Sequence, residues 1–485
     1  MVPLKLLFVA AEMAPLVKVG GLGDVLGALP PALAARGHDV RVLLPAYQRH
    51  MTRGATSLGR LSRGRGRLLE LRETALPCPV WLFETPGFLR RDGRPYLTRA
   101  GTPWMDDPLQ FGRLARVAAD IATGMQATGW QPDVIHCNDW HTGLTPVWMQ
   151  LDGAPAASVF SIHNLGYVGR FPPGILDTLG LPVSLNHPEA LEFHGDIAFM
   201  KGGLRFADRL TTVSPRYAGE ILTPAFGAGL DGLLRARADR LTGILNGIDN
   251  TVWDPATDDY LESRFDAEHL AGKSRERQRL KHALGLLDAD SGPEPVVAWI
   301  GRLAAQKGAD LLLDALPALL RLPLQLAVLG SGDPALERAL SAAARRQPGR
   351  LAVRIGFDEG LAHRLYAGAD MLLMPSRFEP CGLAQLCAMR YGTIPLVTPV
   401  GGLADTVVDV DDPAAATGFH LAEPSAPALL AAVGRALKRF GSEPDAWRRM
   451  MVNAMGQRYD WDASAVRYEE VYRAALADRA ARSAA

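Results

Sequence analysis

Short runs of apolar residues recur along the chain, and most end in a loop rich in Gly, Pro, Asn or Asp that leads into a helical pattern. The first run, at 6–10, is followed by a glycine-rich loop and a helical pattern over 25–36. Most runs are apolar at every position, which is typical of strands covered on both faces. The pattern therefore predicts an α/β fold built from doubly wound parallel sheets. The expected strands lie at 6–10, 40–44, 80–84, 134–137, 158–162, 210–213, 296–300, 324–329, 352–355, 371–374 and 394–397.

This repeating pattern lapses between 246 and 295, where an acidic stretch, a charged helical segment and a turn-rich segment follow one another. We place a domain junction there, with a first domain over 1–247 and a second over 248–485. Each part is large enough for its own sheet, and two such sheets facing each other would form a cleft at the carboxyl ends of their strands. The last helical segment, at 463–477, is followed by no strand and can pack against either domain.

Composition narrows the class of protein. The chain has 485 residues, of which 48% are hydrophobic and 21% charged, so intrinsic disorder and a fibrous repeat are excluded. Lys plus Arg and Asp plus Glu both number 52, a balance that favours neither nucleic acid nor an anionic membrane as partner. No stretch reaches the roughly 18 apolar residues needed to cross a bilayer. The arginine-rich stretch at 60–72 is interpreted as a solvated loop or helix face.

The cellular compartment is predicted from the cysteines and the amino terminus. Only four cysteines are present, and none forms a CxxC pair, which indicates a reducing compartment. The apolar run at the amino terminus ends at Glu12 and leads into a glycine loop, so we interpret it as a strand and not as a cleaved signal. We expect a cytoplasmic protein.

The first glycine loop, at 18–24, lies between a predicted strand and a predicted helix. Backbone N–H groups at such a turn favour an anion, and Lys18 would add a full positive charge. The same glycines, Gly20 and Gly21 among them, are equally compatible with close packing alone.

Three further loops of this kind lie in the second half. After the strand at 296–300, Arg302 and Lys307 precede a helix, and two cations there suit a diphosphate leaving group unless both are merely exposed. After the strand at 371–374, Glu379 can accept hydrogen bonds from sugar hydroxyls or can simply cap the next helix. The backbone N–H groups expected to face a ligand in this third loop belong to Cys381, Gly382 and Leu383, and the fourth loop repeats the pattern with Gly401, Gly402 and Thr406.

In the first half, Asp139 and His163 also follow predicted strands, which places them at the ligand-binding edge of the sheet. Taken alone, each is more typical of a capping aspartate or a core histidine. His136, Asp139 and His141 resemble a metal trio, but His136 lies within the strand and no fourth ligand is apparent, so we expect no metal.

Together these motifs resemble those of the bacterial glycogen synthases, the retaining ADP-glucose glucosyltransferases that share their family with the plant starch synthases. The resemblance runs essentially from end to end. It implies a GT-B architecture, with two Rossmann-like domains, the active site between them and the final helix returning to the first domain. The motifs that carry it are 18–22 (KVGGL), 138–141 (NDWH), 163–165 (HNL), 244–249 (ILNGID), 302–308, 377–383 and 401–406.

The resemblance also implies roles for individual residues. Lys18 would contact the nucleotide sugar, Arg302 and Lys307 would hold its diphosphate, and Glu379 would bind the glucose hydroxyls. The donor sugar would be lined by Asp139, His163 and Asn246, and Tyr96 is matched, in less similar surroundings, to an aromatic residue that contacts substrate. The other substrate-binding positions expected are Gly20, Gly21, Cys381, Gly382, Leu383, Gly401, Gly402 and Thr406.

The implied reaction transfers glucose from ADP-glucose to the non-reducing 4-hydroxyl of an α-1,4-glucan with retention of configuration, without cofactor or metal. The wider superfamily often has a second Glu eight residues after the first, where this chain has Cys387. Spacing leaves a covalent route open, although we favour departure of the diphosphate on the face attacked by the acceptor. The alternatives are another two-domain sugar-nucleotide enzyme, such as a sucrose-type synthase or an epimerase, and a glucan-binding protein without turnover.

Overall fold

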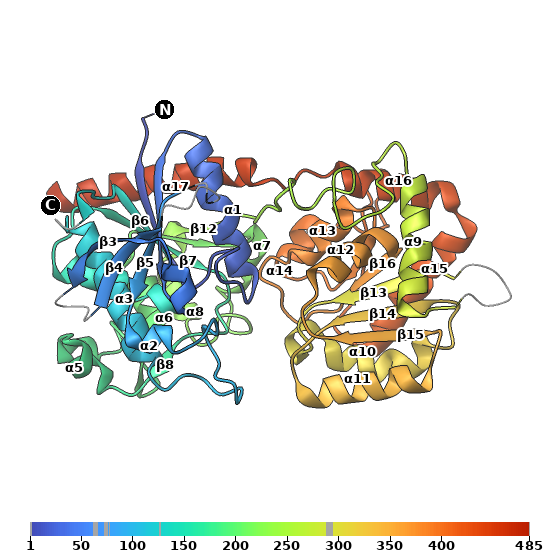
Figure 1. The fold of residues 1–485 in the computed structure, drawn as a ribbon, viewed down its shortest axis with the longest axis horizontal. Coiled ribbons are helices and arrows are strands. Elements are labelled where there is room, and N and C mark those ends of the chain that lie inside the picture. Colours follow the sequence, from blue (N-terminus) through green and yellow to red (C-terminus); the bar gives the residue numbers. More distant parts are fainter. Residues whose placement is uncertain are drawn as a thin grey trace. The chain divides into compact units, whose positions relative to one another are not determined.

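The structure is a computed structural model that describes residues 2–61, 66–71, 76, 78–125, 128–287 and 294–484 (Figure 1). The chain forms two compact units. The first comprises Met1–Leu245 and Trp461–Ala485, and the second comprises Asn246–Asp460. The residues after 460 lie within the second domain by the sequence boundaries, but they group with the first unit, to which the resemblance implied that the final helix returns.

The first unit is built on one large sheet, whose strands among the described residues follow the order β12-β11-β7-β6-β1-β2-β5-β4-β3. From β12 to β5 all neighbours are parallel, as the continuous apolar runs predicted. The chain leaves the central strand β1 toward β2 on one side and returns through β6 on the other, so the strand order reverses between β1 and β6. The parallel strands are β1 (Lys5–Val9), β2 (Asp39–Pro45), β5 (Val80–Glu84), β6 (Val134–Asn138), β7 (Ala157–Ile162), β11 (Arg209–Thr212) and β12 (Leu241–Gly243).

One edge of this sheet differs from the sequence interpretation. The described part of the arginine-rich stretch lies in β3 (Thr56–Leu61) and β4 (Gly66–Leu71), which pair antiparallel with each other and with β5. The interpretation as a loop or helix face was wrong because Leu68, Leu69 and Leu71 are buried against the sheet. Arg60 on β3 and Arg67 on β4, which flank these apolar residues in sequence, obscured the two strands at this edge of the sheet.

Helices cover the sheet of the first unit. The final helix α17 (Trp461–Ala484) contacts α1 (Gly21–Ala35) and the strands β6, β7 and β11. His136 on β6 is held within this contact, with Nδ1 2.9 Å from the Tyr472 hydroxyl of α17 and Nε2 2.6 Å from Ser161 Oγ. The other helices of the unit are α2 (Pro86–Leu89), α3 (Asp107–Ala122), α4 (Thr145–Leu151), α5 (Ile175–Leu179), α6 (Phe199–Phe206), α7 (Pro215–Glu220) and α8 (Asp231–Ala236), and a small sheet contains β8 (Arg170–Phe171), β9 (Glu192–Phe193) and β10 (Asp196–Ala198).

The second unit contains a wholly parallel sheet of order β15-β14-β13-β16-β17-β18 within the described residues. Its strand order reverses between β13 and β16, and a doubly wound sheet binds ligands at such a reversal. The strands are β13 (Val296–Ile300), β14 (Gln325–Gly330), β15 (Leu351–Ile355), β16 (Met371–Met374), β17 (Ile394–Val397) and β18 (Phe419–His420). The helices are α9 (Ala271–Leu284), α10 (Ala309–Leu319), α11 (Pro334–Arg346), α12 (Glu359–Gly368), α13 (Ala384–Arg390), α14 (Gly401–Thr406), α15 (Ala426–Ser442) and α16 (Pro444–Gly456).

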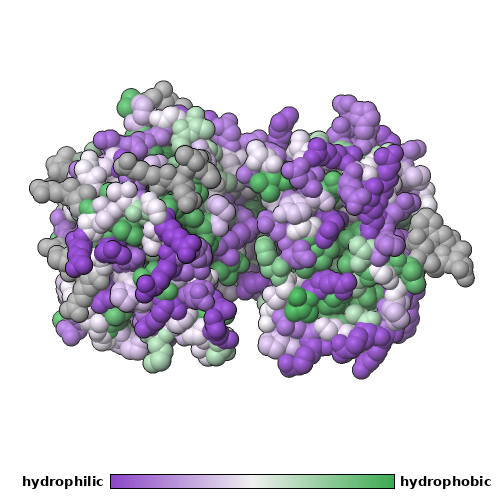
Figure 2. Space-filling view, viewed as in Figure 1, coloured by the Kyte–Doolittle hydropathy of each residue, from purple (hydrophilic) through white to green (hydrophobic). Residues whose placement is uncertain are grey.

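Every strand that the apolar runs predicted is present, which confirms the α/β fold class. Figure 2 shows polar and apolar side chains interspersed over the visible face of each unit. None of the helices in the described ranges combines the length and the apolar character that a membrane span requires.

Candidate functional site

In the second unit, the loops that follow β13 and β16 meet through an ion pair between Lys307 and Glu379. Lys307 ends the short 3-10 helix Ala305–Lys307, and its Nζ contacts Glu379 Oε2. The Glu379 carboxylate also accepts a hydrogen bond from Ser376 Oγ at 3.2 Å, and its side chain is only 6% exposed against 23% for Lys307. A buried carboxylate is thus neutralised by a cation that still reaches solvent.

Gly308 allows the lysine loop to lie against the loop after β16. Its φ is +74°, and a Cβ there would lie 2.3 Å from the Pro375 carbonyl oxygen, so only glycine fits. A cavity of ≈ 40 Å³ adjoins Lys307 at the carboxyl ends of β13 and β16, and Gly382 and Leu383 also line it. The two loops that the sequence singled out independently therefore form one surface.

A second set of contacts holds these loops together. Arg377 bonds Asp310 of α10 through both guanidinium Nη atoms, at 2.8 and 2.6 Å, and its backbone N–H donates to the Gln306 carbonyl. Gln306 in turn accepts a hydrogen bond from Arg302 Nη2 at 2.8 Å. Arg302 is exposed. Its guanidinium is therefore tied through Gln306 to the loop that carries Lys307.

The third and fourth loops touch through their backbones. A Cβ at Gly401 would lie 2.0 Å from the Glu379 carbonyl oxygen, and one at Gly402 would lie 2.1 Å from that of Cys381. Gln385 Nε2 then donates to the carbonyls of Cys381 and Gly382 and to Thr406 Oγ1, at 3.0, 3.0 and 3.2 Å. Gly401, Gly402 and Thr406 are thus placed where they shape the loop that carries Glu379.

Two features of this surface indicate unused hydrogen-bonding capacity. Within the described residues, no acceptor is found for the backbone N–H groups of Cys381, Gly382 and Leu383, which precede α13. Asn246 is 5% exposed, its backbone N–H bonds the Cys381 thiol, and its Oδ1 is buried without a partner in the described part of the chain. Because buried polar atoms are normally paired, such an atom points to a ligand.

In the first unit, Asp139 and His163 are brought together at the carboxyl ends of β6 and β7. Asp139 has a positive φ of 56°, and its Oδ1 accepts the backbone N–H of His163 at 2.8 Å and that of Asn164 at 3.4 Å. Burial is the largest effect on Asp139 and raises its pKa to about 7, although both N–H bonds oppose the shift. Asp139 thus ties two strand ends together and is more than a helix cap.

The protonation of His163 follows from its neighbours. Burial lowers the pKa of His163 to about 4, so the ring is neutral at pH 7. Asn138 donates its Nδ2 to the carbonyls of Val9 and His136, which leaves Asn138 Oδ1, 2.9 Å from His163 Nε2, as the acceptor. We therefore assign the ring proton to Nε2, and Nδ1 is then able to accept a hydroxyl.

An aromatic group adjoins these residues. Trp140 stacks on His141 with ring centroids 4.0 Å apart, and the Tyr96 ring contacts His141 with centroids 5.0 Å apart. Burial lowers the pKa of His141 to about 3, so this histidine is neutral as well. Tyr96, whose surroundings matched less well in sequence, is therefore placed beside the motif at 138–141.

Between β1 and the glycine loop lies Glu12, a residue to which sequence reasoning assigned no role in the site. Glu12 is 3% exposed, and its Oε2 accepts the backbone N–H groups of Val19 at 2.5 Å and Gly20 at 2.9 Å, while Oε1 accepts the Tyr96 hydroxyl. Lys18 pairs with Asp24 at 2.6 Å. The available signal was the charge of Glu12 directly after an apolar strand, which the sequence analysis used only to end the run.

The sequence left two interpretations of the glycines at 18–24, an anion site and close packing, and close packing accounts for only some of them. A Cβ at Gly23 would lie 3.1 Å from Lys18 Cγ and 3.3 Å from Glu12 Oε2, so Gly23 serves close packing. A Cβ at Gly20 would meet nothing within 4 Å. Packing therefore explains Gly23 but does not explain Gly20, and Gly21 follows as the first residue of α1.

Within the described ranges, no group of three or more His, Cys, Asp or Glu side chains is placed so as to hold a metal ion. Both ring nitrogens of His136 are engaged by Tyr472 and Ser161, as described above. His136 therefore serves the core, and His141 belongs to the aromatic group.

Comparisons with known proteins cover nearly the whole chain. Residues 5–236 match the family model of the starch synthase catalytic domain, and residues 294–439 match that of glycosyl transferases group 1. Glycogen synthase 1 of Methylococcus capsulatus is 50% identical over 482 residues, covering 98% of this chain and 97% of that protein. Glycogen synthase of Alkalilimnicola ehrlichii is 50% identical over 481 residues, covering 97% of this chain and 98% of its own.

Solved structures agree with these relatives. The catalytic domain of starch synthase IV from Arabidopsis thaliana, bound to ADP and acarbose, superposes with a TM-score of 0.88 at 32% identity, covering 98% of this chain and all of that one. Sucrose-phosphate synthase from Thermosynechococcus elongatus shares the fold, with a TM-score of 0.63 at 20% identity and 98% and 99% coverage.

Proposed function

Because the chain belongs to the glycogen synthase family of GT-B glycosyltransferases, we propose that it transfers glucose from ADP-glucose to the non-reducing end of an α-1,4-glucan with retention of configuration. The observation that carries this proposal is the buried Glu379, which pairs with Lys307 beside backbone N–H groups for which the described residues offer no acceptor. A relative of this family, starch synthase IV, was solved with ADP bound, which supports an adenine nucleotide as the leaving group.

The second unit supplies the groups that a diphosphate requires. Lys307 and Arg302 provide two positive charges, and the N–H groups of Cys381, Gly382 and Leu383 provide neutral donors. Negative charge builds on the departing phosphate oxygen as the glycosidic bond breaks, so donors already in place stabilise the transition state more than the ground state. These are the groups that we assign to the leaving diphosphate.

Glu379 is assigned to the transferred glucose. Its carboxylate can accept sugar hydroxyls, and Lys307 holds it in place and offsets its charge, so that a diphosphate can bind nearby without strong repulsion. Asn246, whose buried Oδ1 has no partner in the described residues, is a second acceptor for a donor hydroxyl. Cys387, at the position of the second Glu of the wider superfamily, is buried on α13 and offers no carboxylate there.

The first unit is assigned to the sugars. Neutral His163, with Nδ1 able to accept a hydroxyl, and Asp139, which holds the His163 backbone, line the donor glucose, and the Lys18 ammonium contacts the nucleotide sugar. Tyr96 with the aromatic group at Trp140 offers the flat apolar surface on which a sugar ring stacks. For the chemical step we favour proton transfer from the acceptor hydroxyl to the departing phosphate oxygen, on the face that the acceptor attacks.

We propose that the reaction needs no cofactor and no metal, since Lys307 and Arg302 already supply the charge that a cation would bring. The four cysteines, all buried and unpaired, are in keeping with a reducing compartment, and we place the protein in the cytoplasm.

The test is an assay of nucleotide release from ADP-glucose and from UDP-glucose, with glycogen as acceptor and Lys307→Ala as the inactive control. We expect ADP release that depends on glycogen and lengthens its chains. Sucrose formed with fructose as acceptor would indicate a sucrose-type synthase, and a changed sugar nucleotide without transfer would indicate an epimerase. Glycogen binding without any ADP release would refute turnover.

A further inference from the structure

Glu12 joins two segments that are distant in sequence, one of which, at Tyr96, lies 84 residues from Glu12 itself. Its Oε2 accepts both backbone N–H groups at the start of the glycine loop, from Val19 and Gly20, and its Oε1 accepts the Tyr96 hydroxyl. One carboxylate therefore holds the segment that carries Lys18 and the segment that carries Tyr96.

Burying the Glu12 carboxylate is energetically unfavourable for the fold. Burial raises the pKa of Glu12, and the nearby Asp24 raises it further, although the bonds from Tyr96, Val19 and Gly20 oppose the shift. An apolar strand end would carry no such cost. Because the carboxylate lies at the loop amides, the N–H groups of Val19 and Gly20 are occupied by the protein's own anion.

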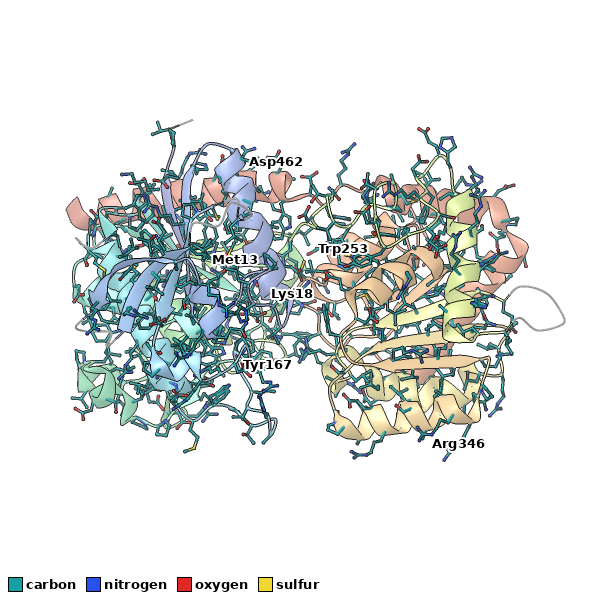
Figure 3. All side chains as sticks on the ribbon, viewed as in Figure 1. Met13, Lys18, Tyr167, Trp253, Arg346 and Asp462 are labelled. Carbon is teal, nitrogen blue, oxygen red and sulfur yellow. The ribbon has the colours of Figure 1, made fainter. Side chains whose placement is uncertain are left out.

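The glycine loop packs closely around Glu12. Gly23 has only a hydrogen where a Cβ would press on the Lys18 stem and on Glu12 Oε2. Lys18 is held against Asp24 at 2.6 Å in the first turn of α1. Figure 3 shows Met13 and Lys18 near one end of α1, with Asp462 near the other.

We propose that Glu12 is a positioning residue for the donor: it sets the conformation of the 18–21 loop and the orientation of Tyr96 together, so that both segments bind ADP-glucose in one arrangement. This inference rests on the proposed function. Glu12 acts through its hydrogen bonds and takes no part in proton transfer.

Three substitutions separate geometry from charge. In Glu12→Gln the amide oxygen can still accept both loop N–H groups while the amide NH₂ faces the Tyr96 oxygen. The kcat/KM for ADP-glucose should therefore stay within about threefold of the wild-type value, which is the range of one neutral hydrogen bond. Glu12→Ala removes all three bonds, and kcat/KM should fall about 10- to 100-fold because the reacting groups are misplaced. Glu12→Asp keeps the charge but is one methylene shorter, so it should lose about tenfold by the same misplacement.

The matched control is Glu469→Gln. Glu469 is also a buried carboxylate of the first unit, 1% exposed, and it bonds Arg36 at the carboxyl end of α1. Helix α1 has 15 residues and so spans about 22 Å, which separates this control from the glycine loop. Glu469→Gln should lower the melting temperature and leave kcat/KM per folded molecule unchanged.

The experiment measures initial rates of ADP release over a range of ADP-glucose concentrations, with thermal melts and amide hydrogen exchange on peptides covering 14–22. Exchange there should speed up in Glu12→Ala and not in Glu12→Gln. Wild-type kcat/KM in Glu12→Ala would overturn the inference, and so would an equal loss in Glu12→Gln and Glu12→Ala, which would indicate a role for charge. If Glu12→Ala does not fold, a wild-type kcat/KM in Glu12→Asp overturns it instead. Absence of ADP release by the wild-type chain would refute the proposed function itself.

Discussion

Replacing Lys307 by alanine tests the proposed leaving-group chemistry most directly. Lys307→Ala removes the cation from the loop after β13 and leaves the Glu379 carboxylate with Ser376 Oγ as its remaining side-chain donor among the described residues. The substitution therefore has two separate effects, one on the chemical step and one on stability.

The magnitude of each effect follows from the geometry. Loss of one preorganised donor to a developing negative charge costs about 2.7 to 4 kcal/mol, so kcat should fall about 100- to 1,000-fold. Removing one partner of a buried pair costs about 3–5 kcal/mol, and exposed pairs contribute about 0–1 kcal/mol. Since Glu379 is 6% exposed and Lys307 23%, we expect an intermediate loss of about 2 kcal/mol of unfolding free energy.

A double variant separates the two effects. Lys307→Ala/Glu379→Gln removes the uncompensated charge, so the melting temperature should recover while kcat stays low. Lys307→Gln keeps a hydrogen-bond donor without the charge and should recover little activity. The assay is ADP release with kcat and KM resolved, alongside thermal melts of each variant. A higher KM with unchanged kcat would show that Lys307 is a uniform binding contact and would refute the reasoning.

Three further predictions concern other groups of the site. Glu379→Gln should lower turnover and leave ADP affinity intact or higher, as measured by calorimetry, because the lost charge opposes a diphosphate; loss of ADP binding would assign the residue to the nucleotide. EDTA should leave ADP release unchanged, and abolition with rescue by Mg²⁺ or Mn²⁺ would contradict the assignment of charge neutralisation to Lys307 and Arg302. The pKa of Asp139 is raised from 3.8 to about 7, so the folded chain retains a proton that the unfolded chain releases. The destabilisation caused by the buried Asp139 carboxylate is therefore absent below about pH 4 and complete above about pH 7. Asp139→Asn should accordingly raise the melting temperature, relative to wild type, more at pH 8 than at pH 5; an equal shift at both pH values would contradict the raised pKa.

The local pattern of apolar residues was sufficient to predict the parallel strands of both sheets. A strand covered on both faces must be apolar at every position, so runs such as 296–300 and 371–374 are visible in the sequence without knowledge of their neighbours. Candidate ligand-binding residues could also be predicted from local sequence, because in doubly wound sheets such residues follow the carboxyl ends of the strands. Lys307, Glu379, Asp139 and His163 were all identified in this way. The antiparallel edge was missed because β3 has no buried residue and the arginines in and around both strands resemble those of a solvated surface.

Partners of the charged groups were decided by the tertiary structure. The sequence around Glu379 is compatible both with a helix cap and with a ligand-binding residue. Lys307, 72 residues away, reaches the Glu379 carboxylate only because β13 and β16 are neighbours in the sheet. Glu12 looked like the end of an apolar run until the fold placed Val19, Gly20 and Tyr96 around it. The physical reason is that burial and hydrogen bonding depend on which strands are neighbours, and strand order is a property of the whole sheet that no local run of residues encodes.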